Sequence, residues 1–317
     1  KTNATAGLSW ATITYGNGSY VAIAGYSAIV SSYVATSTDG TTWTAATMPS
    51  SLLWIDSAYG GTGATTSFVA VAFSSTSIMA SSTNGINWSN QTLPVTTTWS
   101  GITFGGLSFI SIGGAAATSY AASSSDGVTW TQRTLAASAA WRAIKYGNGK
   151  FVAIANGSSY VVSSTDGITW LSSNMPATIA WKDIAYGNNK FVAIAGNNIN
   201  TVGTATSITA YSTDGVIWVS STISVSALWQ AISYYNGQFV AITGSPASPT
   251  ATTSLGAYST DGITWTSFFL SRLDYWKDIV GGGKSFVTIC NGSYVSISQT
   301  YYPTDTNITF GVWEAPL

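Results

Sequence analysis

Seven tryptophans divide this chain into seven similar segments. In its fullest form each segment opens as W-x-x-I-x-[YF]-G and continues into an apolar run similar to F-V-A-I. The opening tryptophans lie roughly 40 to 48 residues apart, and they are Trp10, Trp54, Trp99, Trp141, Trp181, Trp229 and Trp276. A repeat of this length indicates that one structural unit is used seven times along the chain.

The fourth segment shows the pattern within one unit. Short runs rich in β-branched and aromatic residues, at 141–146, 151–155 and 160–163, are separated by turns that contain Gly and Asn, and a fourth run begins near Trp170. Such runs predict four antiparallel strands joined by short turns. One small sheet cannot bury both faces until neighbours stack on it. The sequence therefore predicts an all-β fold, a seven-bladed β-propeller with four antiparallel strands per blade.

We expect a single domain over residues 1–317. Its repeat units are predicted at 10–53, 54–98, 99–140, 141–180, 181–228, 229–275 and 276–317. Only nine residues precede Trp10, so the last unit is expected to complete its own sheet with residues 308–314 and the ring to close by packing.

A second motif recurs once in each of six units and reads S-x-[DN]-G-x-x-W. We call these segments the Asp turns, and they carry Asp39, Asn84, Asp126, Asp166, Asp214 and Asp261. Asp or Asn can accept hydrogen bonds from the main chain of its own turn, and Gly tolerates a left-handed conformation. These six residues are therefore predicted to be structural.

The Asp turns resemble the Asp-box, or bacterial neuraminidase repeat, of sialidase-like propellers, although each is one residue shorter than the family's S-x-D-x-G-x-T-W. The resemblance extends to all seven units, the last being degenerate at 303–310. It implies that the turns lie on the face opposite the ligand site, and the closest analogy is with non-enzymatic propellers of phage and bacterial surfaces.

Composition excludes several classes of partner and site. Only 7% of residues are charged and the net charge is -1, which gives no electrostatic footprint for nucleic acid, and the apolar runs are too short to insert into a membrane. The chain has no His and one Cys, Cys290. No metal site and no cofactor are expected.

An enzymatic function is not expected. By the resemblance, a sialidase needs three converging Arg and a Glu that activates a Tyr, but Arg133, Arg142 and Arg272 lie in different parts of their units and the only Glu is Glu314. A divergent glycosidase remains the third hypothesis.

Charged residues directly follow several opening tryptophans, where the predicted inner strands begin. The candidate ligand-binding residues are Asp56, Arg142, Lys182, Asp183, Lys277 and Asp278. They could bind a polar ligand at the mouth of a central channel. Alternatively, they solvate the mouth, or the Asp side chains bridge neighbouring blades.

We therefore expect a recognition module that binds a glycan or a protein receptor through the face that carries the longest loops, at 196–209 and 244–256. The Ser- and Thr-rich, charge-poor composition is similar to that of proteins displayed outside the cell or on a virion. The alternative hypothesis is a structural component that packs on neighbouring subunits.

Overall fold

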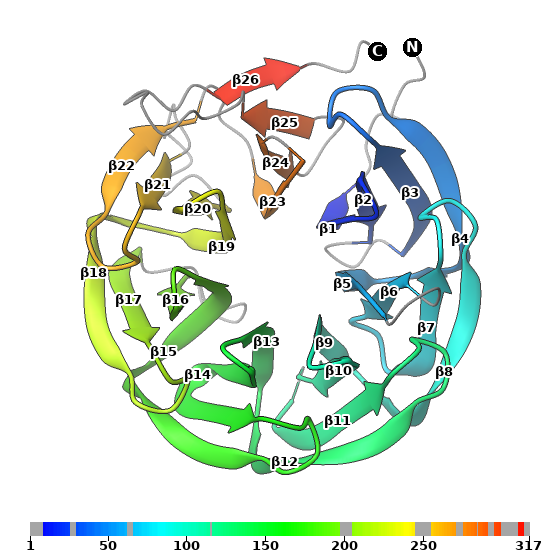
Figure 1. Cartoon of the computed structure of the whole chain (residues 1–317), viewed down its shortest axis with the longest axis horizontal. Coiled ribbons are helices and arrows are strands. Elements are labelled where there is room, and N and C mark those ends of the chain that lie inside the picture. Colours follow the sequence, from blue (N-terminus) through cyan, green and yellow to red (C-terminus); the bar gives the residue numbers. More distant parts are fainter. Residues whose placement is uncertain are drawn as a thin grey trace.

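The strands of this protein radiate around a central axis (Figure 1). The computed structural model describes residues 9–25, 30–61, 66–114, 116–196, 205–244, 255–270, 275–283, 285–290, 295–298 and 310–313. Every regular element in this part of the chain is a β-strand, and every paired strand is antiparallel to its neighbour within a sheet. The predicted all-β propeller fold is confirmed.

The first three units each form one four-stranded sheet, numbered from the axis outward. Unit one comprises β1 (Trp10–Gly16), β2 (Ser19–Ala24), β3 (Ser31–Ser37) and β4 (Thr44–Leu52). Unit two comprises β5 (Trp54–Gly60), β6 (Ser67–Ala72), β7 (Thr76–Ser82) and β8 (Ser89–Thr97). Unit three comprises β9 (Trp99–Gly105), β10 (Ser108–Gly113), β11 (Thr118–Ser124) and β12 (Thr131–Ala139).

Units four and five share one six-stranded sheet. It comprises β13 (Trp141–Gly147), β14 (Lys150–Ser164), β15 (Leu171–Gly187), β16 (Lys190–Ala195), β17 (Thr206–Ser212) and β18 (Val219–Ala227). The first part of β15 pairs with β14 as the outer strand of unit four, and its last part pairs with β16 as the inner strand of unit five. Because β15 runs on from unit four into unit five, the described residues form six connected sheets, while seven inner strands begin at the seven predicted tryptophans.

The last two units again form four-stranded sheets. Unit six comprises β19 (Trp229–Tyr235), β20 (Gln238–Thr243), β21 (Leu255–Ser259) and β22 (Thr266–Phe269). Unit seven comprises β23 (Trp276–Gly282), β24 (Ser285–Cys290), β25 (Val295–Ser298) and β26 (Phe310–Trp313). Because β26 pairs with β25, unit seven is completed by its own C-terminal strand, as the sequence predicts.

The turn predicted at 156–158 in unit four is confirmed, although β14 includes the residues on both sides of it. Residues 150–155 pair with β13, and residues 156–163 pair with β15. The Phe151 ring lies 6.5 Å from the Trp170 ring, which an unbent strand of this length would not allow, and Gly157 adopts a φ of 67° at the reversal.

The core lies between units. The buried apolar clusters each combine neighbouring units, as where Ile110 and Ile112 of unit three pack with Trp141 of unit four. All seven opening tryptophans are at most 2% exposed. Four of their indole N–H groups donate to the carbonyl of the first residue of the third strand in the preceding unit, for example from Trp141 to Thr118 at 2.9 Å. None of these rings is free to stack on a sugar.

We call the contact between two neighbouring inner strands a seam. In most seams a glycine of one strand packs against an aromatic ring of the next. The last glycine of one inner strand lies flat against the aromatic ring of the next unit. A Cβ built on Gly147, for example, would lie 2.0 Å from the Cγ of Tyr186. The corresponding pairs are Gly16–Tyr59, Gly60–Phe104, Gly105–Tyr146, Gly147–Tyr186, Gly187–Tyr234 and Gly282–Tyr15. At these positions glycine is required because no side chain fits.

The seam between units six and seven reverses the pattern. Unit six has Tyr235 where the other units have glycine, and unit seven has Gly281 where they have an aromatic residue. A Cβ on Gly281 would lie 2.1 Å from the Cβ of Tyr235, so Tyr235 fills the space of the missing ring. Its hydroxyl donates to the carbonyl of Gly283 at 2.6 Å, and its ring packs edge-on against Phe286. The two departures from the repeat compensate each other.

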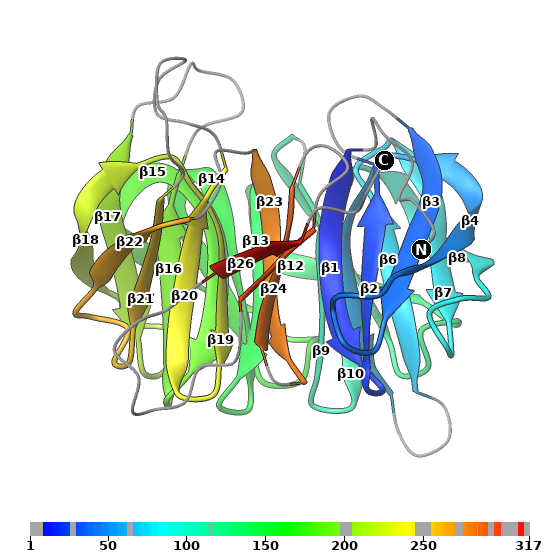
Figure 2. The ribbon, with the colours of Figure 1, turned by 90° about the horizontal axis from the view of Figure 1, so that it is seen from above.

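The ring closes by direct contact between units seven and one (Figures 1 and 2). Val287 and Ile289 pack with Trp10, Ile13 and Tyr20 in one buried cluster. The Tyr20 hydroxyl donates to the carbonyl of Gly282, and the Ile13 N–H donates to Asp278. Closure therefore uses the same kinds of contact as the other seams. In the described residues no helix long and apolar enough to cross a bilayer is found.

Candidate functional site: a charged pocket on the axis

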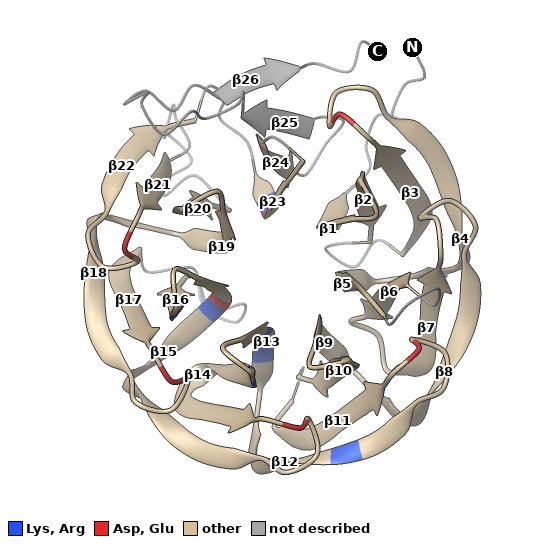
Figure 3. Ribbon diagram, viewed as in Figure 1, with Lys and Arg blue, Asp and Glu red and all other residues tan. Residues whose placement is uncertain are grey.

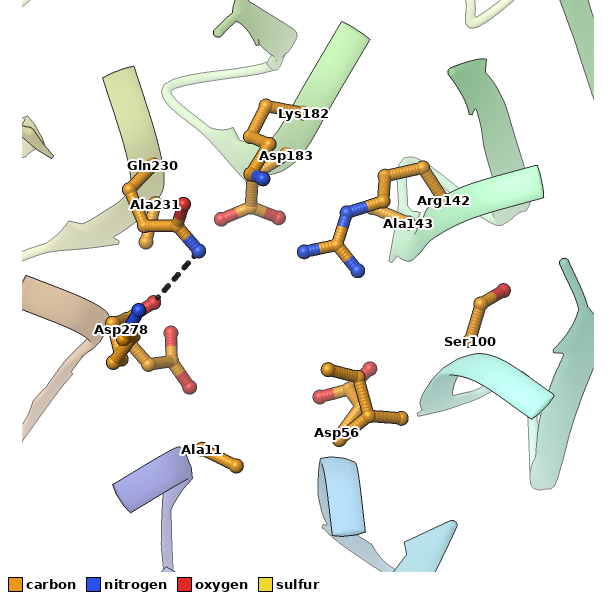
Figure 4. Close-up of a pocket in the computed structure, with 12 residues that line it drawn as sticks. Ala11, Asp56, Ser100, Arg142, Ala143, Lys182, Asp183, Gln230, Ala231 and Asp278 are labelled. Atoms are coloured by element: carbon orange, nitrogen blue, oxygen red, sulfur yellow. Dashed lines mark hydrogen bonds between the residues drawn. The ribbon is translucent and has the colours of Figure 1, made fainter. Parts of the chain in front are cut away.

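The six candidate residues line a single pocket at the axis, where the inner strands begin (Figure 4). Its volume is about 470 Å³, part of it open to solvent. The wall also includes small and neutral residues from the same two positions of each unit, which are Ala11, Ile55, Ser100, Ala143, Gln230 and Ala231. The site thus collects the first and second residues after the opening tryptophans.

A β-bulge explains how two consecutive residues reach one pocket. In unit five Trp181 pairs with Ala195 and Asp183 with Ile194, so Lys182 has no partner in the ladder. The same register shift occurs at the start of the inner strand in all seven units. Successive side chains of a regular strand point to opposite faces, whereas a bulge redirects them. Lys182 and Asp183 can therefore both line the pocket.

The three aspartates bridge neighbouring units through main-chain hydrogen bonds. One oxygen of Asp183 accepts from the N–H of Ile184 in its own strand, and the other accepts from Ile232 in unit six, both at 2.8 Å. Asp56 does the same with Ser57 and Ile102, and Asp278 with Ile279 and Ile13. This was the alternative interpretation of the sequence, and the geometry supports it.

Burial dominates the electrostatics of these carboxyls. Removal from water raises the pKa of Asp56 to about 7 and that of Asp278 to about 8, although the N–H donors oppose the rise. The pKa of Asp183 is also raised by burial. The three carboxyls repel one another, which adds to the shift at Asp56 and Asp278. Near neutral pH Asp56 and Asp278 are thus partly protonated.

The cations come from units four, five and seven. Lys182 is 6% exposed and Lys277 is 8% exposed. Burial lowers the pKa of Lys182 to about 7, with a further contribution from the Arg142 charge, and lowers that of Lys277 to about 8. Arg142 adds a planar guanidinium, whose N–H donors match the geometry of a carboxylate.

Two of these cations offer unused hydrogen-bond donors. Within the described part of the chain, the Nε of Arg142 is buried and has no hydrogen-bond partner, and Lys182 has neither a hydrogen bond nor an ion pair. Figure 4 shows the Arg142 guanidinium pointing toward the middle of the pocket. Gln230 is less free, since its amide donates to the carbonyl of Lys277 at 3.4 Å. What the pocket presents to a ligand is therefore mainly donors.

The Asp turns are built alike and lie away from the pocket. In each, the Asp or Asn side chain accepts from two main-chain N–H groups, which for Asp166 are those of Ile168 and Thr169 at 2.8 Å. These bonds lower the pKa of Asp166 to about 2. Burial would raise the pKa of Asp39, Asp126, Asp214 and Asp261, but the same bonds outweigh it and lower each.

Strand direction places the turns on the opposite face. The third strand of a unit runs parallel to the inner strand, because each is antiparallel to the second, so the turn after it lies where the inner strand ends and not where it begins. Figure 3 shows the acidic turns farther from the axis than the basic segments of the inner strands β13 and β15. The two sets of predicted residues are thus separated in space.

The sequence places Gln230, Ser100 and Ile55 near the channel mouth as well, although only charged residues were proposed to bind the ligand, and all three line the pocket. These occupy the same repeat position as Lys182, directly after an opening tryptophan. Their position in the repeat is the signal that places them there. Arg133 lies on the outer strand β12, where its Nε donates to Ser123, and Arg272 lies outside the described residues. No cluster of metal-ligating side chains is found among the described residues.

Comparison with solved structures identifies the architecture. The chain matches virginiamycin B lyase from Staphylococcus aureus with a TM-score of 0.74 and 11% identity, over 93% of this chain and 96% of that one. It matches YCF48 bound to D1 peptide with a TM-score of 0.59 and 15% identity, over 84% and 82%. It matches the GH74 xyloglucanase from Xanthomonas campestris with a TM-score of 0.72 and 13% identity, over 99% of this chain and 55% of that one.

The chain is a β-propeller. At these identities the likeness shows the fold alone, and the neighbours themselves include a lyase, a peptide-bound protein and a glycoside hydrolase. No family model matches the chain, and no curated protein matches it. Any function must therefore be argued from the pocket.

Proposed function

We propose that this propeller is a non-enzymatic recognition module that binds an acidic glycan, with a sugar carboxylate held in the axial pocket. The observation that carries the proposal is a pair of donors in a pocket on the ring axis, the Arg142 Nε and the Lys182 amine, for which the described residues supply no partner. Guanidinium groups bind carboxylates through two parallel hydrogen bonds, and such charge-assisted bonds are strong. A carboxylate would supply an acceptor to the Arg142 guanidinium, whose Nε has none among the described residues.

The division of the wall supports an acidic rather than a neutral sugar. Each oxygen of Asp56, Asp183 and Asp278 already accepts a main-chain N–H, so the carboxyls are engaged in holding the units together. The remaining donors come from units four to seven, whereas units one and two contribute the small and apolar Ala11 and Ile55. This arrangement suits a ligand with an anionic end and an uncharged body.

The same division argues against glycoside hydrolysis. A glycosidase requires two carboxyls that are free to exchange protons with the substrate or attack it. All three carboxyls of the pocket instead bridge neighbouring units. Hydrolysis would have to use groups whose loss also disconnects two units, which favours binding over turnover.

We further propose that the chain is an Asp-box propeller displayed outside the cell or on a virion. The uniform geometry of the six Asp turns and the low content of charged residues support this proposal. Secretion, or surface labelling of the intact source particle, tests the location.

A glycan array that contains uronic acids, sialic acids and their neutral parents tests the proposed function. We expect binding to acidic members only, and loss of that binding in Arg142→Ala. Thr131→Ala, on the exposed outer strand β12, is the control that should bind normally. Binding restricted to neutral glycans, or acidic binding that survives Arg142→Ala, would contradict the proposal. Capture of acidic peptides instead of glycans would assign the pocket to a protein receptor.

Packing on neighbouring subunits is the second candidate. Exposed aliphatic side chains on units four and five favour it, since Ile168, Leu171 and Ile217 are 53%, 67% and 71% exposed. Light scattering across a concentration series tests it, and a strictly monomeric chain at high concentration would count against self-assembly.

A further inference from the structure

We propose that Lys182 is a reactive amine that captures small 2-oxo acids as an imine in the axial pocket. The proposal uses the same pocket as the proposed function but needs no glycan ligand. Its test is a covalent adduct and not an equilibrium affinity, so the two can fail separately.

The placement of Lys182 is unusual for a lysine. Its side chain is buried to 6% exposure, yet it lines a pocket that is open to solvent. A buried ammonium ordinarily pairs with a carboxylate or with several acceptors, but no ion pair and no hydrogen bond to Lys182 is found in the described chain. A small molecule in the pocket can therefore reach an amine that no described residue holds.

The surroundings favour the neutral, nucleophilic form of this amine. Burial is the larger cause, and the charges of Arg142 and Lys277 act in the same direction, while Asp183 opposes them. Together they bring the pKa of Lys182 from 10.5 to about 7. Lysines that are desolvated or placed beside another cation are the ones that form Schiff bases with carbonyl substrates.

Arg142 sets the class of carbonyl compound. Its buried Nε has no partner within the described residues, and its guanidinium projects into the same space as Lys182 (Figure 4). A 2-oxo acid carries a carboxylate directly beside its carbonyl carbon. With the carboxylate on Arg142, the carbonyl carbon would be presented to an amine on the neighbouring unit.

The reaction balances without a redox partner. The Nζ lone pair attacks the carbonyl carbon, and the oxygen takes a proton to give a carbinolamine. A second proton then goes to the hydroxyl group of the carbinolamine, which leaves as water. The nitrogen gives up its two original protons, and the C=N bond of the imine remains. Because the pocket is partly open, solvent water can deliver and accept these protons.

Reductive trapping tests the proposal. The full chain is incubated at pH 7 with pyruvate and cyanoborohydride, which reduces an imine to a stable secondary amine, and adducts are located by peptide mapping. At pH 7 a pKa of about 7 gives Lys182 roughly a thousandfold more free amine than a lysine at 10.5. Allowing for restricted access, we expect Lys182 to be modified about tenfold faster or more than the exposed Lys145 of the same sample.

Two comparisons complete the test. Lys182→Arg keeps the charge and should lose the rapid adduct. Lys190→Arg, on β16 and outside the pocket lining, should retain it. Acetone, which lacks a carboxylate, should react more slowly than pyruvate with Lys182. If the exposed Lys145 is modified faster than the buried Lys182 in the unaltered chain, the proposal is overturned, and no variant is needed for this result. Equal rates for acetone and pyruvate would overturn the role given to Arg142.

Discussion

The reversed seam between units six and seven gives a quantitative test of how the ring is held together. Tyr235→Gly removes a half-buried ring, its edge-on contact with Phe286 at 5.9 Å between ring centres and its hydrogen bond to Gly283. Truncation of a fully buried aromatic side chain lowers the free energy of unfolding by roughly 3 to 5 kcal/mol. Loss of the half-buried Tyr235 ring should therefore lower it by about 2 to 3 kcal/mol. Gly281→Tyr alone places a Cβ against Tyr235 and should cost about 1 to 3 kcal/mol through overpacking.

The double variant restores the arrangement of the other six seams. Glycine then ends the inner strand of unit six, and an aromatic ring in unit seven lies against it, as Tyr186 lies against Gly147. We expect the double variant to be more stable than the sum of the single effects by about 2 kcal/mol, within the range measured for contacting residues. Urea denaturation followed by tryptophan fluorescence measures all four free energies of unfolding. Additive effects within about 0.5 kcal/mol would refute the idea that the two residues compensate each other.

Three further predictions concern pH and polar contacts. Because the folded pKa of Asp56 and Asp278 is raised from 3.8 to about 7 and about 8, the folded state binds more protons than the unfolded state, and the free energy of unfolding should fall between about pH 4 and 8. Because the folded pKa of Lys182 is lowered, the free energy of unfolding should rise again between about pH 7 and 10. Thermal melts across this pH range should show a minimum in stability, and Asp278→Asn should reduce the loss of stability between about pH 4 and 8. Asp278→Ala should speed hydrogen exchange at the Ile13 amide by more than at Ile232, whereas equal changes would argue against a local bridge. Asp166→Ala should cost about 1 to 2 kcal/mol by leaving the Ile168 and Thr169 amides unpaired, while a melt unchanged from that of the parent would show that the turn needs no carboxylate.

Much of the fold could be predicted because the repeat itself carries the information. The opening tryptophans, the glycine turns and the apolar runs each recur at fixed positions, so one unit interpreted correctly gives the others. The merging of units four and five through β15 could not be predicted, because it depends on a junction after Ile179 that has no breaker residue.

The candidate site could be predicted only in part. The charged residues after the opening tryptophans stand out because charge is scarce in this chain, and all six line the pocket. Their different roles could not be assigned from sequence. Whether an Asp faces a ligand or the main chain of the next unit depends on the bulge that follows Trp181 and on the spacing between units, which only three-dimensional packing determines.

The contact between Arg142 and a sugar carboxylate is tested most directly by the nitrogen-15 and proton signal of its Nε–H group. We predict that this signal shifts saturably when glucuronate is added and stays unchanged with glucose at the same concentrations. No shift with glucuronate, or equal shifts with both sugars, would contradict acid recognition in the axial pocket.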